Sequence, residues 1–197
     1  MGADQLGEET RRSGSALKVR AFFGLPLPDP HRDALDLYRD ECVRVAPDFR
    51  WTPAANLHVT IRFLGHVEED VAFGIASRVG ASGPDGFACG LGETGTFRRG
   101  RLARVVWIGL SEGEQDAGRL AALVEAECVR AGLEPETRPF RAHITVARAK
   151  PRDGAPLPEL PRPPAVEPWR ASRLLLYQSR LGRSGSIYEP LRTIPLR

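Results

Sequence analysis

The chain has 197 residues, of which 42% are hydrophobic and 27% charged, and its formal net charge at pH 7 is +3. This length and composition are those of an ordinary soluble globular protein, with a core in one domain or two small lobes. No apolar run approaches the roughly 18 residues of a membrane span, and the polar N-terminus lacks the apolar stretch of a signal peptide, so we expect a cytoplasmic protein with no membrane partner.

Residues 1–15 are rich in Gly, Ser and charge and have almost nothing to bury, so we expect a flexible tail followed by one domain over 16–197. Within that domain, hydrophobic periodicity and turn residues predict both strands and helices. In chain order we expect a strand at 17–25, a helix from Asp29 to before Pro47, a strand at 57–63, a helix at 71–79, a hairpin of strands at 87–97 and 102–110, a helix at 116–131, a strand at 143–146, and final strands at 172–181 and 187–196.

Two connecting segments have unusual compositions. Residues 150–168 contain seven prolines and cannot form regular structure for long, so we expect a surface excursion. The turn of the hairpin is rich in arginine, and 26 of the 28 basic residues of the chain are arginines. The arginines of this turn are Arg98, Arg99, Arg101 and Arg104. They either contact RNA or belong to a hairpin turn that is simply exposed to solvent.

The chain repeats itself. Residues 58–61 (His-Val-Thr-Ile) and 143–146 (His-Ile-Thr-Val) share the pattern His-x-Thr-x at an offset of 85 residues, and two further segments match in the same order at offsets of 85 and 86. This indicates a duplicated strand–helix–strand unit. We therefore expect an α+β, bilobal fold in which two antiparallel or mixed sheets flank a central cleft, with helices outside and the two histidines as symmetry mates.

Within each motif, side chains alternate between the faces of a strand. His58 and Thr60 share an open face, as do His143 and Thr145, so each strand offers one imidazole and one hydroxyl. A metal site fits poorly, because neither motif has a carboxylate, cysteine or second histidine at the short spacing of zinc or iron ligands. A hydrolytic triad also fits poorly, since no Gly-x-Ser-x-Gly elbow is present.

Two imidazoles and two hydroxyls suit a phosphodiester. One imidazole accepts a proton from the nucleophile, the other donates one to the leaving oxygen, and the hydroxyls bind the nonbridging oxygens. The near-symmetric sequence leaves open which histidine is the acid. A bell-shaped rate profile between about pH 5 and 8 is expected from two coupled imidazoles.

Four further residues are candidates for substrate binding. Arg62 and Arg141 have the strand parity of the motif histidines and offer guanidinium groups to phosphate. Phe22 and Trp107 match each other at the offset of 85, and we expect both to line the cleft, where an aromatic face stacks on a base.

The remaining histidines and the cysteines are not expected to carry chemistry. His31 lies at a helix start and His66 just beyond a strand, and we expect both on the surface. Cys42, Cys89 and Cys128 are an odd number without metal-like spacing, so we expect reduced, mostly buried thiols.

Together these motifs resemble the two-histidine (2H) phosphoesterases, specifically the bacterial and archaeal RNA 2′,3′-cyclic phosphodiesterases, also named 2′,5′ RNA ligases. The match runs from residue 17 to the end of the chain. It is carried by segments 20–25, 56–65, 139–148 and 176–179. The bilobal fold of that family, with both histidines on the floor of a pseudo-twofold cleft, agrees with the duplication.

The resemblance implies that the protein opens a terminal 2′,3′-cyclic phosphate to a 2′-phosphomonoester without a metal or other cofactor. By motif it implies that His58 is the proton donor to the departing 3′ oxygen and His143 the base that activates water. Thr60 and Thr145 are then the phosphate ligands. The implied partner is an RNA or nucleotide with a 2′,3′-cyclic phosphate end, and we expect a monomer.

Two other functions stay open at this point. A 2′,5′ RNA ligase would use the same histidines with a 5′-hydroxyl in place of water, although water needs no second docking surface. A nucleotide- or RNA-binding module would keep the cleft and lack catalysis. The presence of both histidines and both threonines argues against such a loss.

Overall fold

The computed structural model describes residues 17–182 and 185–197, so the expected tail over 1–15 and the start of the domain at residue 16 lie outside it. Its helices are α1 (Asp29–Val45), α2 (Glu69–Ala81) and α3 (Glu114–Arg130), with a short 3-10 turn η1 (Ala54–Asn56). Its strands are β1 (Lys18–Pro26), β2 (Phe49–Trp51), β3 (His58–Glu68), β4 (Phe87–Arg99), β5 (Leu102–Glu112), β6 (His143–Ala149), β7 (Trp169–Ala171), β8 (Arg173–Gly182) and β9 (Gly185–Pro195).

Local sequence signals account for the helix ends. α1 has a proline at its first turn, Pro30, where the missing amide proton breaks no hydrogen bond. α3 is followed by Gly132, whose φ of +86° lies in the left-handed region that closes many helices. α2 begins earlier than predicted, with Glu69 and Asp70 at the positive end of its dipole.

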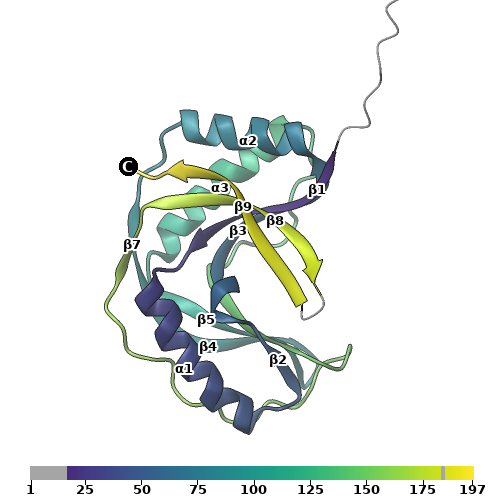
Figure 1. The fold of residues 1–197 in the computed structure, drawn as a ribbon, viewed down its shortest axis with the longest axis vertical. Coiled ribbons are helices and arrows are strands. Elements are labelled where there is room, and N and C mark those ends of the chain that lie inside the picture. Colours follow the sequence, from purple (N-terminus) through teal and green to yellow (C-terminus); the bar gives the residue numbers. More distant parts are fainter. Residues whose placement is uncertain (1–16, 183–184) are drawn as a thin grey trace, which may run out of the picture.

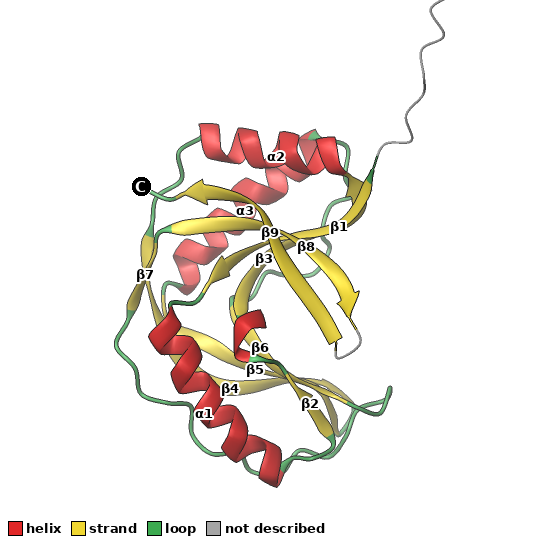
Figure 2. Ribbon diagram, viewed as in Figure 1, coloured by secondary structure: helices red, strands yellow, loops and turns green. Residues whose placement is uncertain are grey.

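The strands form two lobes that meet at one point. Backbone pairing gives the order β7-β4-β5-β6-β3-β1-β8-β9, with β2 paired to β6. Backbone pairing joins the lobe of β1, β3, β8 and β9 to the lobe of β4, β5 and β6 through one antiparallel residue pair, Val59 with Ile144, here called the junction pair. Figure 1 shows the two lobes. The α+β, bilobal fold with antiparallel strands and outer helices is therefore confirmed, as Figure 2 shows.

The junction pair lies on the pseudo-twofold axis of the duplication. Its two residues are themselves separated by 85 positions, the offset of the two motifs. On either side the strand order is repeated, because β6-β5-β4 corresponds to β3-β1-β8. The segment 150–168 stands in the second half where α2 stands in the first, and it forms no helix.

The two halves exchange their helices. α1 follows β1, yet it packs on the other lobe, where the Tyr38 hydroxyl lies 3.4 Å from Oγ1 of Thr94 on β4. α3 follows β5 and packs on the lobe of β1, where Glu125 binds Arg62 of β3 (Figure 1). Each lobe is therefore completed by the helix of the other half, which ties the two lobes together.

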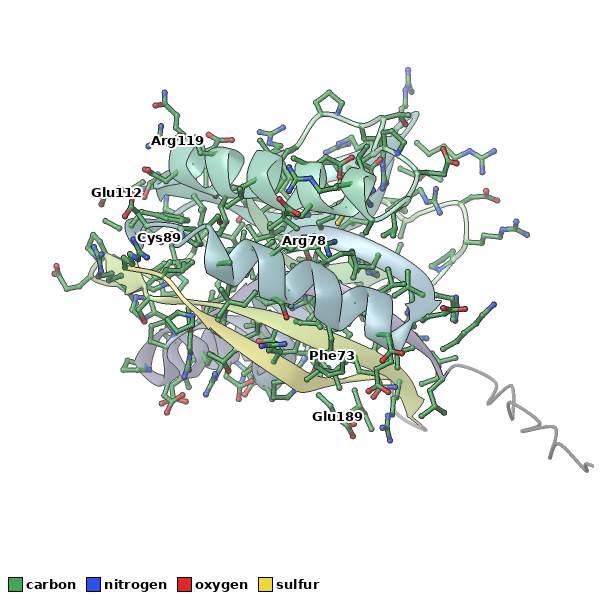
Figure 3. The ribbon with its side chains drawn as sticks, turned by 90° about the horizontal axis from the view of Figure 1, so that it is seen from above. Phe73, Arg78, Cys89, Glu112, Arg119 and Glu189 are labelled. Atoms are coloured by element: carbon green, nitrogen blue, oxygen red, sulfur yellow. The ribbon has the colours of Figure 1, made fainter. Side chains whose placement is uncertain are left out.

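α2 and α3 lie side by side over the first lobe. Nε of Arg78 on α2 is 2.8 Å from Oε2 of Glu127 on α3, and the Glu127 side chain is buried. Figure 3 shows Arg78 between the two helices. Among the described residues, no helix is long and apolar enough to cross a membrane.

The core confirms the expected thiols and corrects one histidine. Cys42, Cys89 and Cys128 are buried and free of disulfides. His31 was expected on the surface and is buried, with its ring 4.7 Å from that of Trp169. Its Nε2 donates a hydrogen bond of 2.8 Å to a backbone carbonyl of the proline-rich segment, so the imidazole fastens that segment to α1.

Candidate active site

The two His-x-Thr motifs come together at the junction pair. Because β3 and β6 are antiparallel there, extending the register by one residue puts His58 opposite Thr145 and Thr60 opposite His143. The residues of the junction pair are fully buried, and their neighbours point to the other face of the sheet. Two imidazoles and two hydroxyls therefore share one face, here called the motif quartet.

A backbone carbonyl orients each imidazole. Nδ1 of His58 lies 2.8 Å from the carbonyl oxygen of Asn56. Nδ1 of His143 lies 2.7 Å from that of Arg141. A carbonyl only accepts, so Nδ1 carries the proton in both rings and Nε2 is the nitrogen free for chemistry. Nε2 of His58 also lies 2.9 Å from Oγ1 of Thr60, which donates to it when the ring is neutral.

The environment lowers the pKa of both imidazoles. Burial is the main cause for His58, whose pKa falls to about 4, and the charges of His143 and Arg148 lower it further. Burial also lowers the pKa of His143, followed by the charges of Arg148 and Arg141. Both rings are therefore neutral at pH 7. An anion bound between them would favour the charged form and raise the pKa values again.

The surroundings of the two histidines differ. Aromatic rings pack around His58, with the centroids of Phe22 and Tyr188 at 4.8 and 5.2 Å. Phe22 is only 1% exposed and stacks on Tyr177 at 5.0 Å. Aromatic rings also lie near His143, but this residue, unlike His58, lines a cavity of about 1180 Å³. The pseudo-twofold symmetry of the backbone therefore does not extend to the walls of the site.

This cavity includes three members of the motif quartet, Thr60, His143 and Thr145. Its walls come from both lobes: β3 and α3 on one side, and β6 with the β4–β5 hairpin on the other. The segment that joins α3 to β6 also contributes. The cavity therefore extends from the motif quartet to a rim formed by segments distant in sequence.

Trp107 lies beside His143, but it is buried and its face is covered. The two ring centroids are 6.0 Å apart, and the guanidinium carbon of Arg141 lies 4.3 Å from the indole centroid. The indole also packs against Gly95, where any Cβ would overlap the ring. Trp107 therefore positions Arg141 at the cavity, and stacking of a base on Trp107 or Phe22 stays a prediction.

A bulge in β3 alters which side chains face the cleft. The register between β1 and β3 skips Ile61, so that Phe23 pairs with Arg62 and Gly24 with Thr60. The extra residue reverses the alternation of side chains beyond it. A prediction from strand parity therefore holds only up to Ile61.

The predicted parity of Arg62 is wrong for this reason. Its guanidinium points to α3, where it binds Glu125, and it donates a hydrogen bond of 2.8 Å to the carbonyl of Glu134. Phe63, which strict alternation from His58 puts on the core face, is 45% exposed and lines the cavity, with its ring 5.4 Å from that of Phe22. Arg62 still borders the cavity, and a phosphate contact from it stays a prediction.

The matching bulge in β6 brings in a residue that sequence reasoning missed. The register between β5 and β6 skips Val146, between Thr145 and Ala147. Arg148 consequently has its side chain on the cavity side with Thr145. Simple alternation from His143 puts Arg148 on the opposite face, so no periodic signal identifies it.

The registers also correct one pair of supposed equivalents. Trp107 lies opposite Thr145, and Gly24 lies opposite Thr60. In the structure, Trp107 is thus equivalent to Gly24. In the sequence repeat, Trp107 instead matches Phe22, which lies two positions before Gly24. The sequence match and the structural match differ by two residues, an even number. The side chains of Phe22 and Trp107 therefore still point to the face of the strand that was predicted.

Two tyrosines beside His58 were also missed. Tyr177 and Tyr188 lie on β8 and β9, more than a hundred residues after the first motif. Tyr177 belongs to the segment 176–179 that carries part of the family resemblance, which was the one available signal. Among residues 17–182 and 185–197, no group of three His, Cys, Asp or Glu side chains forms a metal site.

A family model described as LigT like Phosphoesterase matches this chain twice, over residues 25–107 and 108–188. The chain belongs to this family. Each match contains one of the two His-x-Thr motifs, in agreement with the duplication. In this LigT-like chain the motif quartet therefore takes one histidine and one threonine from each family repeat.

Relatives of this LigT-like phosphoesterase share most of its length. An RNA 2′,3′-cyclic phosphodiesterase of Aeropyrum pernix is 33% identical over 157 residues, covering 78% of this chain and 89% of the relative. The enzyme of that name from Escherichia coli (strain K12) is 29% identical over 174 residues, covering 88% and 94%. The crystal structure of E. coli LigT complexed with 3′-AMP has a TM-score of 0.80 at 27% identity, covering 91% of this chain and 99% of LigT.

Proposed function

We propose that the protein is an RNA 2′,3′-cyclic phosphodiesterase that hydrolyses a terminal 2′,3′-cyclic phosphate to a 2′-phosphomonoester. The observation that carries this proposal is the motif quartet, in which two imidazoles with free Nε2 atoms and two hydroxyls share one face. Relatives named RNA 2′,3′-cyclic phosphodiesterase support the reaction, and the LigT complex with 3′-AMP supports a nucleotide ligand.

In the proposed mechanism His143 is the base. Its lowered pKa keeps Nε2 unprotonated at neutral pH, and the carbonyl of Arg141 holds the ring. Nε2 takes a proton from water as the water oxygen bonds to phosphorus. His143 lines the open cavity, which gives water access.

His58 is the proposed acid. The bound phosphate, carrying one negative charge, raises the pKa of His58, so that its Nε2 is protonated in the complex. As the bond from phosphorus to the 3′ oxygen breaks, this proton goes to the departing oxygen, which leaves a 3′-hydroxyl and a 2′-phosphate. Proton exchange with solvent then restores the starting states of both imidazoles.

Thr60 and Thr145 are the proposed ligands of the nonbridging oxygens, because both hydroxyls lie on the face that carries the two histidines and both line the cavity. The Thr60 hydroxyl, which donates to Nε2 of His58 while that ring is neutral, becomes available when this nitrogen is protonated. Arg141 lies at the same cavity and supplies a positive charge. Donors fixed before the reaction stabilise the charge that builds on phosphorus-bound oxygens. These residues would complete the chemistry without a metal or other cofactor.

We also propose that the protein is monomeric and cytoplasmic. One chain supplies both histidines and both threonines, so the site needs no second copy. The three free, buried thiols suit a reducing compartment. A sedimentation measurement tests the first proposal.

The decisive experiment incubates the protein, with EDTA present, with an oligoribonucleotide that ends in a 2′,3′-cyclic phosphate. We expect a 2′-phosphate product, which resists a 3′-specific phosphatase. His58→Ala and His143→Ala should each reduce kcat/KM about 100-fold or more, as loss of an acid or base does. Losses below about tenfold in both variants would exclude the two-histidine mechanism.

A sulfur-substituted substrate separates the two roles. In a 2′-O,3′-S-cyclic phosphorothiolate the leaving sulfur needs little help from an acid, because a thiol is much more acidic than an alcohol. His58→Ala should then lose much less activity than on the oxygen substrate, while the loss in His143→Ala stays the same. The reverse result would exchange the two roles. Adding 5′-hydroxyl RNA to the same reactions tests for 2′,5′ ligation.

A further inference from the structure

The second lobe carries an arginine wall beside the motif quartet. It consists of four exposed arginines that line the cavity: Arg98, Arg104, Arg148 and Arg152. None of them belongs to the motif quartet, and the proposed chemistry of the two histidines does not account for Arg98, Arg104 or Arg152.

Strand register assembles this wall. Phe97 of β4 pairs with Val105 of β5, which in turn pairs with Arg148 of β6, so these residues form one row across three strands. The register skips Arg104 next to this row, as the extra residue of a bulge. Arg152 lies in the segment after β6, and the bridge from Ala103 to Ala155 holds that segment against β5.

The arginine wall is not neutralised. Within the described part of the chain, none of its four arginines forms an ion pair. Three carboxylates line the cavity: Glu125 and Glu136 are already paired with Arg62 and Arg138, and Glu114 forms no ion pair with the wall in the described part of the chain. Clustered positive charges repel one another and attract anions, so this wall is built for a polyanionic partner.

Among the described residues, the unpaired arginines at the cavity are confined to the second lobe, because Arg62 of the first lobe is bound to Glu125. The residues equivalent to Arg148 and Arg152 in the first lobe, at the motif offset of 85, are Phe63 and Val67. The strand registers make Ala21 the equivalent of Arg104. A general basic composition would not leave unpaired arginines on one half of a duplicated site only. The arginine wall therefore extends to one side of the motif quartet only, outwards over the β4–β5 hairpin.

Aromatic side chains accompany the arginines. Phe97 and Phe140 line the same cavity and are 39% and 38% exposed. The Phe97 ring lies 5.1 Å from that of His143, between the motif quartet and the wall. Arginines that follow a backbone, with aromatic rings beside them, are the usual features of a site for single-stranded nucleic acid. A cavity of about 1180 Å³ also exceeds the roughly 300–1000 Å³ that holds one small ligand.

We propose that the arginine wall binds the phosphodiester backbone of the nucleotides that precede the cyclic phosphate, so that the protein acts on RNA ends in preference to 2′,3′-cyclic mononucleotides. This inference rests on the proposed function. A mononucleotide has no internal phosphodiester and gains nothing from the wall. An oligonucleotide gains one ionic contact for each phosphate that reaches an arginine.

The test compares a 2′,3′-cyclic mononucleotide with a tetraribonucleotide of the same terminal base. The variant changes Arg98, Arg104 and Arg152 to Gln together and leaves Arg148, whose charge acts on both histidines, in place. A control with the same change in net charge substitutes Gln at Arg44, Arg119 and Arg192, which are exposed and do not line the cavity. Figure 3 shows Arg119 at the periphery of α3.

We expect the wall variant to lose about tenfold or more in kcat/KM on the tetranucleotide, through a higher KM with kcat unchanged, and less than about twofold on the mononucleotide. The plot of log kcat/KM against log salt should become less steep by about 2, since each phosphate contact on a single strand contributes about 0.7. The control variant should retain the activity and salt slope of the parent on both substrates.

The proposal that the wall binds the RNA backbone would be overturned by either of two results. The wall variant would lose equal kcat/KM on the mononucleotide and the tetranucleotide, or the control variant would lose as much kcat/KM as the wall variant. Binding of a tetranucleotide that already ends in a 2′-phosphate, measured by fluorescence anisotropy, tests the same contacts without turnover. If the parent hydrolyses neither substrate, the proposed function fails. The wall then stands only if this binding is lost in the wall variant and kept in the control.

Discussion

The orientation of His58 and His143 depends on one backbone hydrogen bond each. Because each Nδ1 donates to the carbonyl two residues earlier, the local strand geometry alone presents Nε2 to the cleft. The pKa values depend on more distant groups. Burial and Arg148 lower both of them, so the bell-shaped profile of kcat/KM should lie at lower pH than the window of about 5 to 8 expected for ordinary imidazoles.

At this scale Arg148→Gln is the informative change. Removing a positive charge favours the protonated imidazoles, so the pKa values of both histidines should rise and both limbs of the kcat/KM profile should move to higher pH. Histidine titrations followed by NMR measure the same shifts without substrate. Arg148→Lys keeps the charge and serves as the control, whose limbs should stay near those of the parent. Unmoved limbs in Arg148→Gln would contradict the electrostatic coupling.

At the scale of elements, two bulges and one helix exchange decide what the strands present. The bulge at Ile61 turns Arg62 to α3, and the bulge at Val146 turns Arg148 to the cavity. Periodicity predicted the longer strands and missed the three-residue strands β2 and β7, which are too short to show a period. It also failed just beyond each motif, because one extra residue reverses the alternation. The exchange of α1 and α3 between lobes left no signal in the chain, since each helix has one apolar stripe that suits either sheet.

Two glycine substitutions test the packing of these elements with opposite expected signs. Gly95→Ala puts a Cβ into the indole of Trp107, and such overpacking should lower the free energy of unfolding by about 1–3 kcal/mol. Displacing the indole also removes the support under Arg141, so kcat/KM should fall.

Gly74→Ala lies within α2, where the added Cβ meets only the end of the Arg78 side chain. This substitution should raise the free energy of unfolding by about 0.5–1 kcal/mol.

Urea unfolding of both variants measures these changes. The activity of Gly74→Ala, which lies outside the cavity, should equal that of the parent. A Gly95→Ala variant as stable and active as the parent would show that the indole can move without cost.

At the scale of the whole molecule, burial of the motif quartet couples folding to pH. The pKa of His58 is about 4 in the folded protein and about 6.5 in an unfolded chain, so the unfolded state binds more protons between these values. The free energy of unfolding should therefore fall as pH drops from about 6.5 to about 4. For one full proton the slope is at most about 1.4 kcal/mol per pH unit.

The comparison of parent and His58→Asn isolates this contribution. Urea unfolding at several pH values from 7 to 4 should give a shallower dependence in the variant, because Asn does not titrate. Parallel curves for the two proteins would mean that His58 has the same pKa in both states.

The sequence by itself determined the chemistry and the symmetry of this protein. The repeated His-x-Thr motif and its flanking apolar residues specify two strands with an imidazole and a hydroxyl on one face, and the offset of 85 predicts a duplicated α+β fold. These features are local or periodic, so they can be recognised from the sequence alone.

Only the tertiary structure decided how the two halves differ. Three features each join segments that are far apart in sequence. They are the aromatic rings around His58, the packing of the Arg141 guanidinium over Trp107, and the arginine wall beside His143. Their positions depend on strand register, bulges and the exchange of helices, which follow from packing over the whole chain. Alternation within a single strand carries no information about them.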